Sequence, residues 1–187
     1  MHGKPLLELS AADIQRNFNV NLLSHFHTLR TFLPAMLDTE SGGTIVTVSS
    51  VLGKLGASHL SDYTAAKAGL IAMHASLRAE LSSTTAPKGA ENIRTVLVLP
   101  GQLATNLFAG VHTPSSFLGP VIEPVELARD IVRMIDDGVS GEISTPLYAQ
   151  CIDWLHVLPV ALQKLARSLA GVDRAMEGFG SYKHKMG

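Results

Sequence analysis

The stretch 44–69, TIVTVSSVLGKLGASHLSDYTAAKAG, combines three local patterns that together indicate an α/β fold. It begins with a β-branched apolar run that is typical of a buried strand. A loop punctuated by glycines follows, and the stretch ends in a helical pattern rich in small residues. Ser49 and Ser50 close the strand. Tyr63 and Lys67 stand four positions apart, so their side chains share one face of the helix.

The rest of the chain continues this alternation of helix and strand. The predicted elements are a helix over 9–37, a strand over 42–50, a helix over 62–84, a strand over 93–101, a long loop over 102–122, a helix over 123–138 and a strand over 141–148. Apolar strands separated by helices imply a parallel sheet with right-handed crossovers. Ligands of such sheets bind at the carboxyl ends of the strands, where Ser50 and Pro100-Gly101 lie.

The composition fits a globular protein without a nucleic acid partner. The 187 residues carry a formal net charge of −1, with 46% hydrophobic and 17% charged residues. Cys151 is the only cysteine, which excludes an intrachain disulfide and favours a reducing, intracellular compartment. We see no signal peptide and no run of about 18 apolar residues that would span a membrane. His25 and His27 lack partners with metal-ligand spacing, so we expect no metal.

The stretch 44–69 resembles the active-site segment of the short-chain dehydrogenase/reductase family. That family places a serine at a strand end, 13 residues before the tyrosine of a Tyr-x-x-x-Lys motif, and Ser50, Tyr63 and Lys67 show this spacing. Tyr-x-x-x-Lys alone would be weak evidence, because any solvated helix can carry such a pair. The resemblance implies a Rossmann-like parallel sheet flanked by helices and a nicotinamide cofactor, NAD(P)(H).

Two further segments resemble the same family. Asn21 lies in NVNLL, which matches the family's asparagine on the preceding helix, although Asn17 and Asn19 are close by. LPGQLAT, ending at Thr105, matches the family's Pro-Gly followed by a threonine, here Pro100 and Gly101. An epimerase or dehydratase of the same superfamily also uses Tyr-x-x-x-Lys, but this Pro-Gly pattern favours a dehydrogenase.

The chemistry gives each of these residues a role that the resemblance supports. A free phenol has a pKa of about 10, and a nearby ammonium favours the phenolate, so Lys67 would lower the pKa of Tyr63, the general acid/base. Ser50 would hydrogen-bond the substrate oxygen, and Asn21 would hold a water in the proton path. Lys67 would also bind the nicotinamide ribose, while the backbone from Pro100 to Thr105 would hold the carboxamide. The small residues around Tyr63 would let the cofactor approach the helix.

Some nearby polar residues have simpler interpretations. Ser49 is expected to be structural. His59 lies in the loop before Tyr63, where we favour a surface position over a substrate contact.

The resemblance covers only the later part of the family's fold. The family begins with a strand and a glycine-rich turn that receives the pyrophosphate, and no such turn occurs here. We therefore expect the C-terminal half of a doubly wound fold, with the edge of the 44–50 strand exposed. We also expect weak or absent binding of NAD(P)(H). The alternative function is a catalytically silent fragment that acts as an interaction module.

The C-terminal segment indicates a possible second unit. We divide the chain into a partial dehydrogenase domain, 1–148, and a helical appendage, 149–187. A stripe at helical spacing, formed by Leu158, Leu162, Leu165 and Leu169, is compatible with a helix on a membrane surface or with a packed helix. Pro159 interrupts any single long helix.

The appendage resembles the branch of microsomal retinol dehydrogenases and lipid-droplet hydroxysteroid dehydrogenases. This branch implies a lipophilic alcohol or ketone substrate, such as a retinoid, steroid or fatty alcohol. It also implies a location in the cytoplasm or at endoplasmic reticulum or lipid-droplet membranes. The family implies a homo-oligomer paired through the helices at 9–37 and 62–84.

Overall fold

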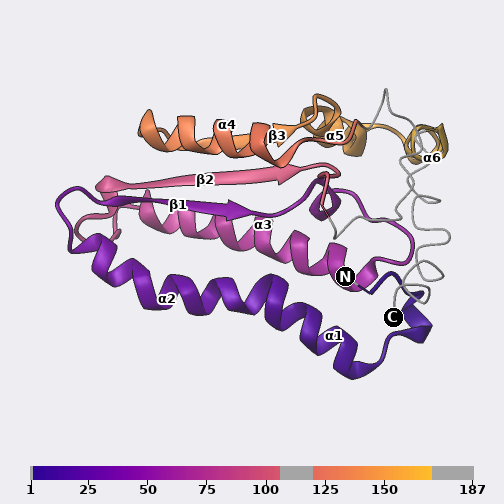
Figure 1. Ribbon diagram of the computed structural model, residues 1–187, viewed down its shortest axis with the longest axis horizontal. Coiled ribbons are helices and arrows are strands. Elements are labelled where there is room, and N and C mark those ends of the chain that lie inside the picture. The colour runs from indigo at the N-terminus through magenta and orange to yellow at the C-terminus, as the bar shows by residue number, and fades with distance from the viewer. Residues whose placement is uncertain (1, 106–119, 170–187) are drawn as a thin grey trace.

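The computed structural model describes residues 2–105 and 120–169 (Figure 1). Its helices and strands are α1 (Ala11–Phe18), the π-helical segment η2 (Asn19–Leu23), α2 (Ser24–Leu37), β1 (Gly43–Val48), α3 (Ser61–Leu81), β2 (Ile93–Pro100), α4 (Pro124–Asp136), β3 (Gly141–Thr145), α5 (Tyr148–Val157) and α6 (Val160–Leu169). The predicted alternation of helices and strands is confirmed. Of the predicted loop 102–122, residues 106–119 lie outside the described residues.

The described residues form a three-stranded parallel sheet in the order β1-β2-β3. Val48 is paired with Val98, and Pro100 with Thr145, so the carboxyl ends of neighbouring strands meet at one edge of the sheet. Within the described part of the chain β1 pairs with β2 alone, so its other edge has no strand partner there.

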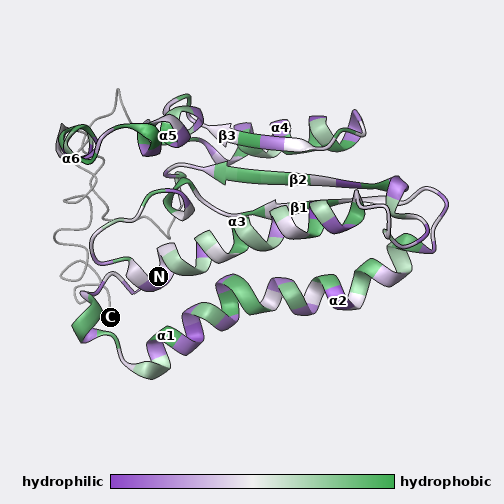
Figure 2. Ribbon diagram, turned by 180° about the vertical axis from the view of Figure 1, so that it is seen from behind, coloured by the Kyte–Doolittle hydropathy of each residue, from purple (hydrophilic) through white to green (hydrophobic). Residues whose placement is uncertain are grey.

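The central strand β2 is buried on both faces, which explains its continuous apolar sequence (Figure 2). Val96 and Val98 pack against Leu127 of α4 on one face. Leu97 and Leu99 pack on the opposite face with α5 and the turn after β1. This second face also carries α2 and α3, so the sheet lies between α4 and the α2–α3 pair (Figure 1).

The long helix predicted over 9–37 is one helical rod with an irregular centre. Ser10 caps it: its Oγ accepts a hydrogen bond from the Asp13 backbone N–H, and the Asp13 side chain accepts one from the Ser10 N–H. The predicted long helix is confirmed, with Asn19–Leu23 in π-helical geometry at its centre. Such segments are rare in proteins, and those that occur are often found at functional sites.

A neighbouring helix, rather than open space for a cofactor, explains one of the small residues of α3. A Cβ added at Gly69 would lie 2.9 Å from Leu22 Cδ2, so glycine here permits close packing of α3 against η2. Ala66 is fully buried, whereas Ala65 and Ala68 are exposed. Helix packing thus accounts for the small residue at Gly69, and the expected cofactor approach to the helix stays a prediction.

Two predicted elements end earlier than expected for local reasons, and the predicted leucine stripe is interrupted. The strand over 141–148 ends at Thr145, because Pro146 has no N–H to continue the ladder. The helix over 62–84 ends at Leu81, before serines and threonines that form helices poorly. Leu158 is extended and lies between α5 and α6, so it does not belong to a helical stripe; Pro159 does separate two helices as predicted.

The first helix of the predicted appendage contributes to the core. Ala149 and Ile152 of α5 are buried and pack with Leu97 and Leu99 of β2. The boundary at residue 148 stays a prediction, and residues 170–187 lie outside the described part.

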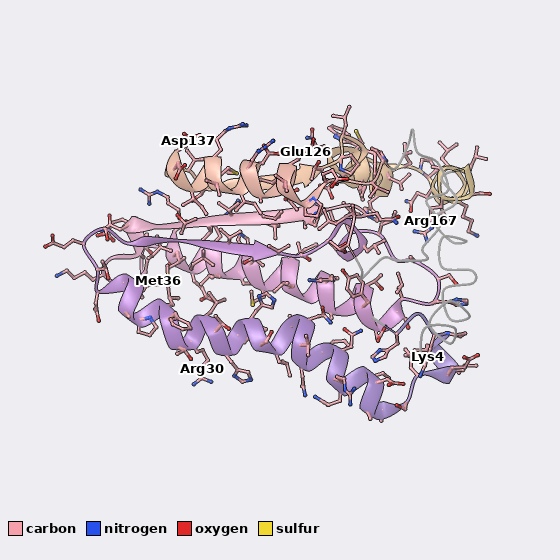
Figure 3. All side chains as sticks on the ribbon, viewed as in Figure 1. Lys4, Arg30, Met36, Glu126, Asp137 and Arg167 are labelled. Atoms are coloured by element: carbon pink, nitrogen blue, oxygen red, sulfur yellow. The ribbon has the colours of Figure 1, made fainter. Side chains whose placement is uncertain are left out.

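The outer faces of the helices are mixed in character. Charged side chains such as Arg30 of α2 and Glu126 of α4 point away from the sheet (Figure 3). Large apolar side chains are also exposed on the rod formed by α1, η2 and α2, at Val20, Phe26 and Phe32. No helix among the described residues has both the length and the hydropathy needed to cross a bilayer.

Gly42 and Gly138 have similar positive φ values but different surroundings, so comparing them separates the cost of backbone strain from the cost of steric overlap. Gly42 and Gly138 have φ values of 63° and 62°. A Cβ at Gly42 would lie 2.0 Å from the Asn92 carbonyl oxygen, whereas one at Gly138 would meet nothing within 4 Å. We expect Gly138→Ala to lower the free energy of unfolding by about 1 kcal/mol and Gly42→Ala by about 3 kcal/mol or more, measured by urea denaturation. Equal losses would contradict the close approach of the turn at Gly42 to Asn92.

Candidate active site

Ser50 and Tyr63 lie together at the carboxyl end of β1. Ser50 follows the strand and is 4% exposed, while Tyr63 is in the first turn of α3 and is 5% exposed. The Ser50 hydroxyl lies close enough to the Tyr63 phenol to lower its pKa in part. The Ser50 Oγ also accepts a hydrogen bond of 3.1 Å from the Leu52 backbone N–H and donates at 3.5 Å to the Pro100 carbonyl. The parallel pairing of β1 and β2 thus brings Pro100 to the same place.

Lys67 lies beside Tyr63 as the helical spacing predicts. Its Nζ is 5.9 Å from the centroid of the Tyr63 ring and donates a 3.1 Å hydrogen bond to the Val48 carbonyl. An ammonium has three donors, so two remain for other acceptors. A cation bonded to one neutral carbonyl is suited to hold a polyol such as a ribose.

Burial dominates the titration of both groups. It raises the pKa of Tyr63, and the hydrogen bond with Ser50 opposes this shift in part. It lowers the pKa of Lys67. The net shift of the Tyr63 pKa is thus upward, because loss of hydration dominates. A lowering of this pKa by the Lys67 charge stays a prediction.

Asn21 lies in η2 and is oriented by a neighbouring asparagine. Its Nδ2 donates to the Asn17 backbone carbonyl at 3.1 Å and to the Asn17 side-chain oxygen at 2.8 Å. Asn17 is buried, and its own Nδ2 donates to Asp62 at 2.6 Å. Sequence reasoning missed Asn17 and Asp62. The available signals were an amide one helical turn before Asn21 and a carboxylate directly before Tyr63.

The segment after β2 is held by the neighbouring strand. The Gly101 N–H donates to the Thr145 carbonyl at 2.7 Å, and a Cβ at Gly101 would lie 2.8 Å from Pro146 Cδ. Pro100 contacts Ser50, whereas Thr105 lies further along the chain, where its N–H donates to the Leu103 carbonyl at 2.8 Å. The structure therefore brings Pro100 to Ser50.

Two other polar residues were singled out from the sequence. The Ser49 hydroxyl donates a 2.9 Å hydrogen bond to the Lys67 carbonyl, which confirms its structural role. His59 is partly buried just before α3 and has a φ of 61°, a left-handed conformation that is uncommon outside glycine.

The residues present fit one end of a nicotinamide dinucleotide. Ser50, Tyr63 and the two remaining donors of Lys67 match the reacting oxygen and the ribose. For the pyrophosphate the sequence offers no glycine-rich turn. Within residues 2–105 and 120–169 no group of three His, Cys, Asp or Glu side chains is placed to hold a metal ion.

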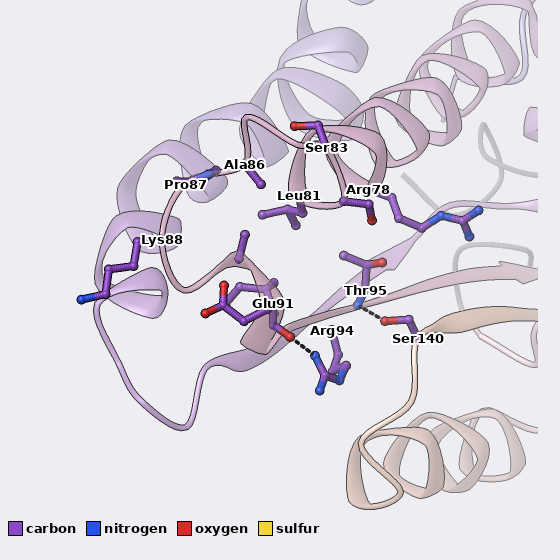
Figure 4. Close-up of a pocket in the computed structure, with 13 residues that line it drawn as sticks. Arg78, Leu81, Ser83, Ala86, Pro87, Lys88, Glu91, Arg94, Thr95 and Ser140 are labelled. Atoms are coloured by element: carbon purple, nitrogen blue, oxygen red, sulfur yellow. Dashed lines mark hydrogen bonds between the residues drawn. The ribbon is translucent and has the colours of Figure 1, made fainter.

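A cavity of about 790 Å³ lies elsewhere in the described structure (Figure 4). Its lining includes Arg78 from the end of α3, Arg94 and Thr95 from the amino end of β2, and Ser140 before β3. The amino end of a parallel strand is opposite to the edge where Ser50 lies. Because catalytic groups of such sheets gather at the carboxyl ends, we do not assign the chemistry to this cavity.

Comparisons with known proteins agree with the geometry. The family model described as short chain dehydrogenase matches residues 1–115. The uncharacterised oxidoreductase TDA5 of Saccharomyces cerevisiae is 35% identical over 161 residues, which cover 86% of this chain and 48% of that protein. The 17-beta-hydroxysteroid dehydrogenase 13 of Rattus norvegicus is 35% identical over 68% of this chain and 40% of that protein. The epidermal retinol dehydrogenase 2 of Homo sapiens is 29% identical over 98% of this chain and 58% of that protein.

Solved structures show the same fold. A short chain dehydrogenase from Burkholderia cenocepacia in complex with NADP superposes with a TM-score of 0.66 at 24% identity, covering 89% of this chain and 65% of that one. A 3-oxoacyl-acyl-carrier-protein reductase from Brucella melitensis gives 0.61 at 28% identity, covering 74% and 53%. The fold is thus of the Rossmann-like class. The chain belongs to the short-chain dehydrogenase family.

The match to the family is partial in length. The chain spans about half the length of the curated relatives it matches, between 40% and 58% of each.

The hydrogen bond between Ser50 and Tyr63 can be tested by titration. Since this bond lowers the pKa of the phenol, Ser50→Ala should move the Tyr63 pKa further up. Ser49→Ala is the matched control, because Ser49 bonds to a backbone carbonyl instead. The ultraviolet absorbance of phenolate measures both, after subtraction of a Tyr63→Phe sample that removes one of the three tyrosines. An equal response of the two serine variants would contradict the assigned bond.

Proposed function

We propose that this chain carries the catalytic half of an NAD(P)-dependent oxidoreductase that acts on an alcohol or ketone of a lipophilic substrate. The observation that carries the proposal is the placement of Ser50, Tyr63 and Lys67 around one point at the carboxyl end of β1. Proposed catalytic residues are these three and Asn21. Proposed cofactor contacts are Tyr63, Lys67, Pro100, Gly101 and Thr105.

Each side chain has a part in moving one proton. Hydride transfer at the substrate carbon is the chemistry that a bound nicotinamide would supply. In the reducing direction the Tyr63 hydroxyl gives its proton to the carbonyl oxygen, and in the oxidising direction the phenolate takes the proton of the alcohol. Ser50 holds the same oxygen and stabilises its developing charge. Lys67 stabilises the phenolate that remains after proton transfer.

The raised pKa of Tyr63 makes reduction and oxidation depend on pH in opposite directions. A group with a raised pKa keeps its proton to higher pH, so the phenol is the resting form at neutral pH. Reduction uses that form and is lost only as the pH rises through the raised pKa. Oxidation uses the phenolate and grows over the same alkaline window.

The substrate class is inferred from relatives and from the surface. Similar proteins include a retinol dehydrogenase and a 17-beta-hydroxysteroid dehydrogenase. Large apolar side chains on α5, Trp154 and Val157, are 75% and 78% exposed. These features support a retinoid, steroid or fatty alcohol substrate and peripheral contact with endoplasmic reticulum or lipid-droplet membranes. The exposed Val20, Phe26 and Phe32 support a homo-oligomer that pairs through the helical rod.

The first test is a titration of the full chain with NADH and NADPH, followed by nicotinamide fluorescence. Saturable binding and turnover of a retinoid or steroid would support the proposal. Tyr63→Phe should then abolish turnover, by about 100-fold or more, and leave nucleotide binding unchanged, because it removes one hydroxyl and keeps the ring. Undiminished turnover of Tyr63→Phe would refute its role. Absence of binding in a folded sample would favour the alternative, a silent interaction module.

Membrane contact has its own reporter. Trp154 is the single tryptophan of the chain, so its fluorescence is free of other indole signals. We expect a blue shift with anionic vesicles and co-flotation of the protein with them, both reduced by Val157→Lys on the same helix. Exposed Val125→Lys on α4 is the control. An unshifted spectrum at low salt would indicate that α5 does not enter the membrane interface.

A further inference from the structure

A buried carboxylate joins the two helices that carry Asn21 and Tyr63. Asp62 is 4% exposed. Its Oδ1 accepts a 2.8 Å hydrogen bond from the Tyr63 backbone N–H, while its Oδ2 accepts one of 2.6 Å from Asn17 Nδ2 and lies 2.9 Å from His2 Nδ1. A charge at this depth is costly unless its lone pairs are satisfied, and here three donors satisfy them.

The direction of the hydrogen bonds is set by Asp62. An ionised carboxylate only accepts, so the side chain of Asn17 must turn its NH2 group toward Asp62. Its carbonyl oxygen then faces the other way and accepts from Asn21 Nδ2 at 2.8 Å. These bonds fix the orientation of the Asn21 amide: its NH2 group points toward Asn17, and its oxygen points away from Asn17. An aspartate one residue before the proton donor thus dictates how an amide on the other helix is oriented.

Further charges face this network at its solvent end. His2 Nε2 lies 3.6 Å from Asp13 Oδ1, and Lys4 donates to Asp13 at 3.0 Å. His2 and Lys4 lie on the N-terminal segment, and Asp13 lies on α1. Asp13 takes no part in the hydrogen bonds that Asp62 accepts from Tyr63 and Asn17. Asp13 therefore belongs to the same cluster without touching the proposed catalytic residues.

We propose that Asp62 is a positioning residue for the reaction: through Asn17 it orients Asn21, and through the backbone it fixes the first turn that carries Tyr63. This inference rests on the proposed oxidoreductase function and adds a residue to it. Asp62 acts only through other residues, because its oxygens are occupied by the donors named above.

The test is Asp62→Asn in the full chain. An asparagine has one oxygen where the carboxylate has two, so its NH2 group would oppose that of Asn17 and turn it around. We expect kcat to fall by about tenfold or more while the KM for the nucleotide changes by less than about twofold, since misplacement affects the proton step. The side-chain amide signals of Asn21 in NMR spectra should shift as well.

The double variant Asn17→Asp/Asp62→Asn exchanges donor and acceptor and restores their match. It should recover kcat and the Asn21 amide signals, even if Asp62→Asn alone folds poorly. Asp13→Asn is the control and should change neither. Unchanged Asn21 signals and kcat in Asp62→Asn, or no recovery in the double variant, would overturn the proposal. If the unmodified chain turns over no substrate, the proposed function fails, and the Asn21 signals still decide whether Asp62 orients that amide.

Discussion

A reciprocal pair of hydrogen bonds between the end of β1 and the middle of α3 holds the site together. The Ser49 hydroxyl donates to the Lys67 carbonyl, and the Lys67 ammonium donates back to the Val48 carbonyl. Because strand and helix are fixed in this register, Ser50, which follows the strand, lies near Tyr63, one turn before Lys67. Ser49 thus supports the candidate site without belonging to it, so the two serines after the strand have different roles.

The helices and strands could be predicted from the sequence because each carries a local signal. Branched apolar runs identify β1 and β2, and the parallel pairing follows from the helix between them. The π-helical geometry of η2 has no comparable signal. It accompanies the close packing of Leu22 on Gly69 and the bond from Asn17 to Asp62, contacts between residues 45 or more positions apart.

The sequence allowed the residues of the candidate site to be proposed, but it did not predict the direction in which the pKa of Tyr63 shifts. Helical spacing places Tyr63 and Lys67 on one helix face, since residues four apart share it. The place of Ser50 beside them was implied by the resemblance to the family's active-site segment. The pKa of Tyr63 depends on how much water its hydroxyl loses, and this is a property of the folded surroundings. The same holds for Asp62, whose importance rests on a partner contributed by another helix.

The π-helical segment also sets the angular phase of the rod. One extra residue in a helix rotates everything before it by about 100° relative to everything after it. The rod can therefore turn Asn17 toward the start of α3 while Leu29 and Leu33 stay on the sheet. The chain thus directs two faces toward different neighbours within one continuous helical rod. A deletion of a single residue in η2 would leave the rod helical but rotate α1, so that Asn17 would no longer face Asp62.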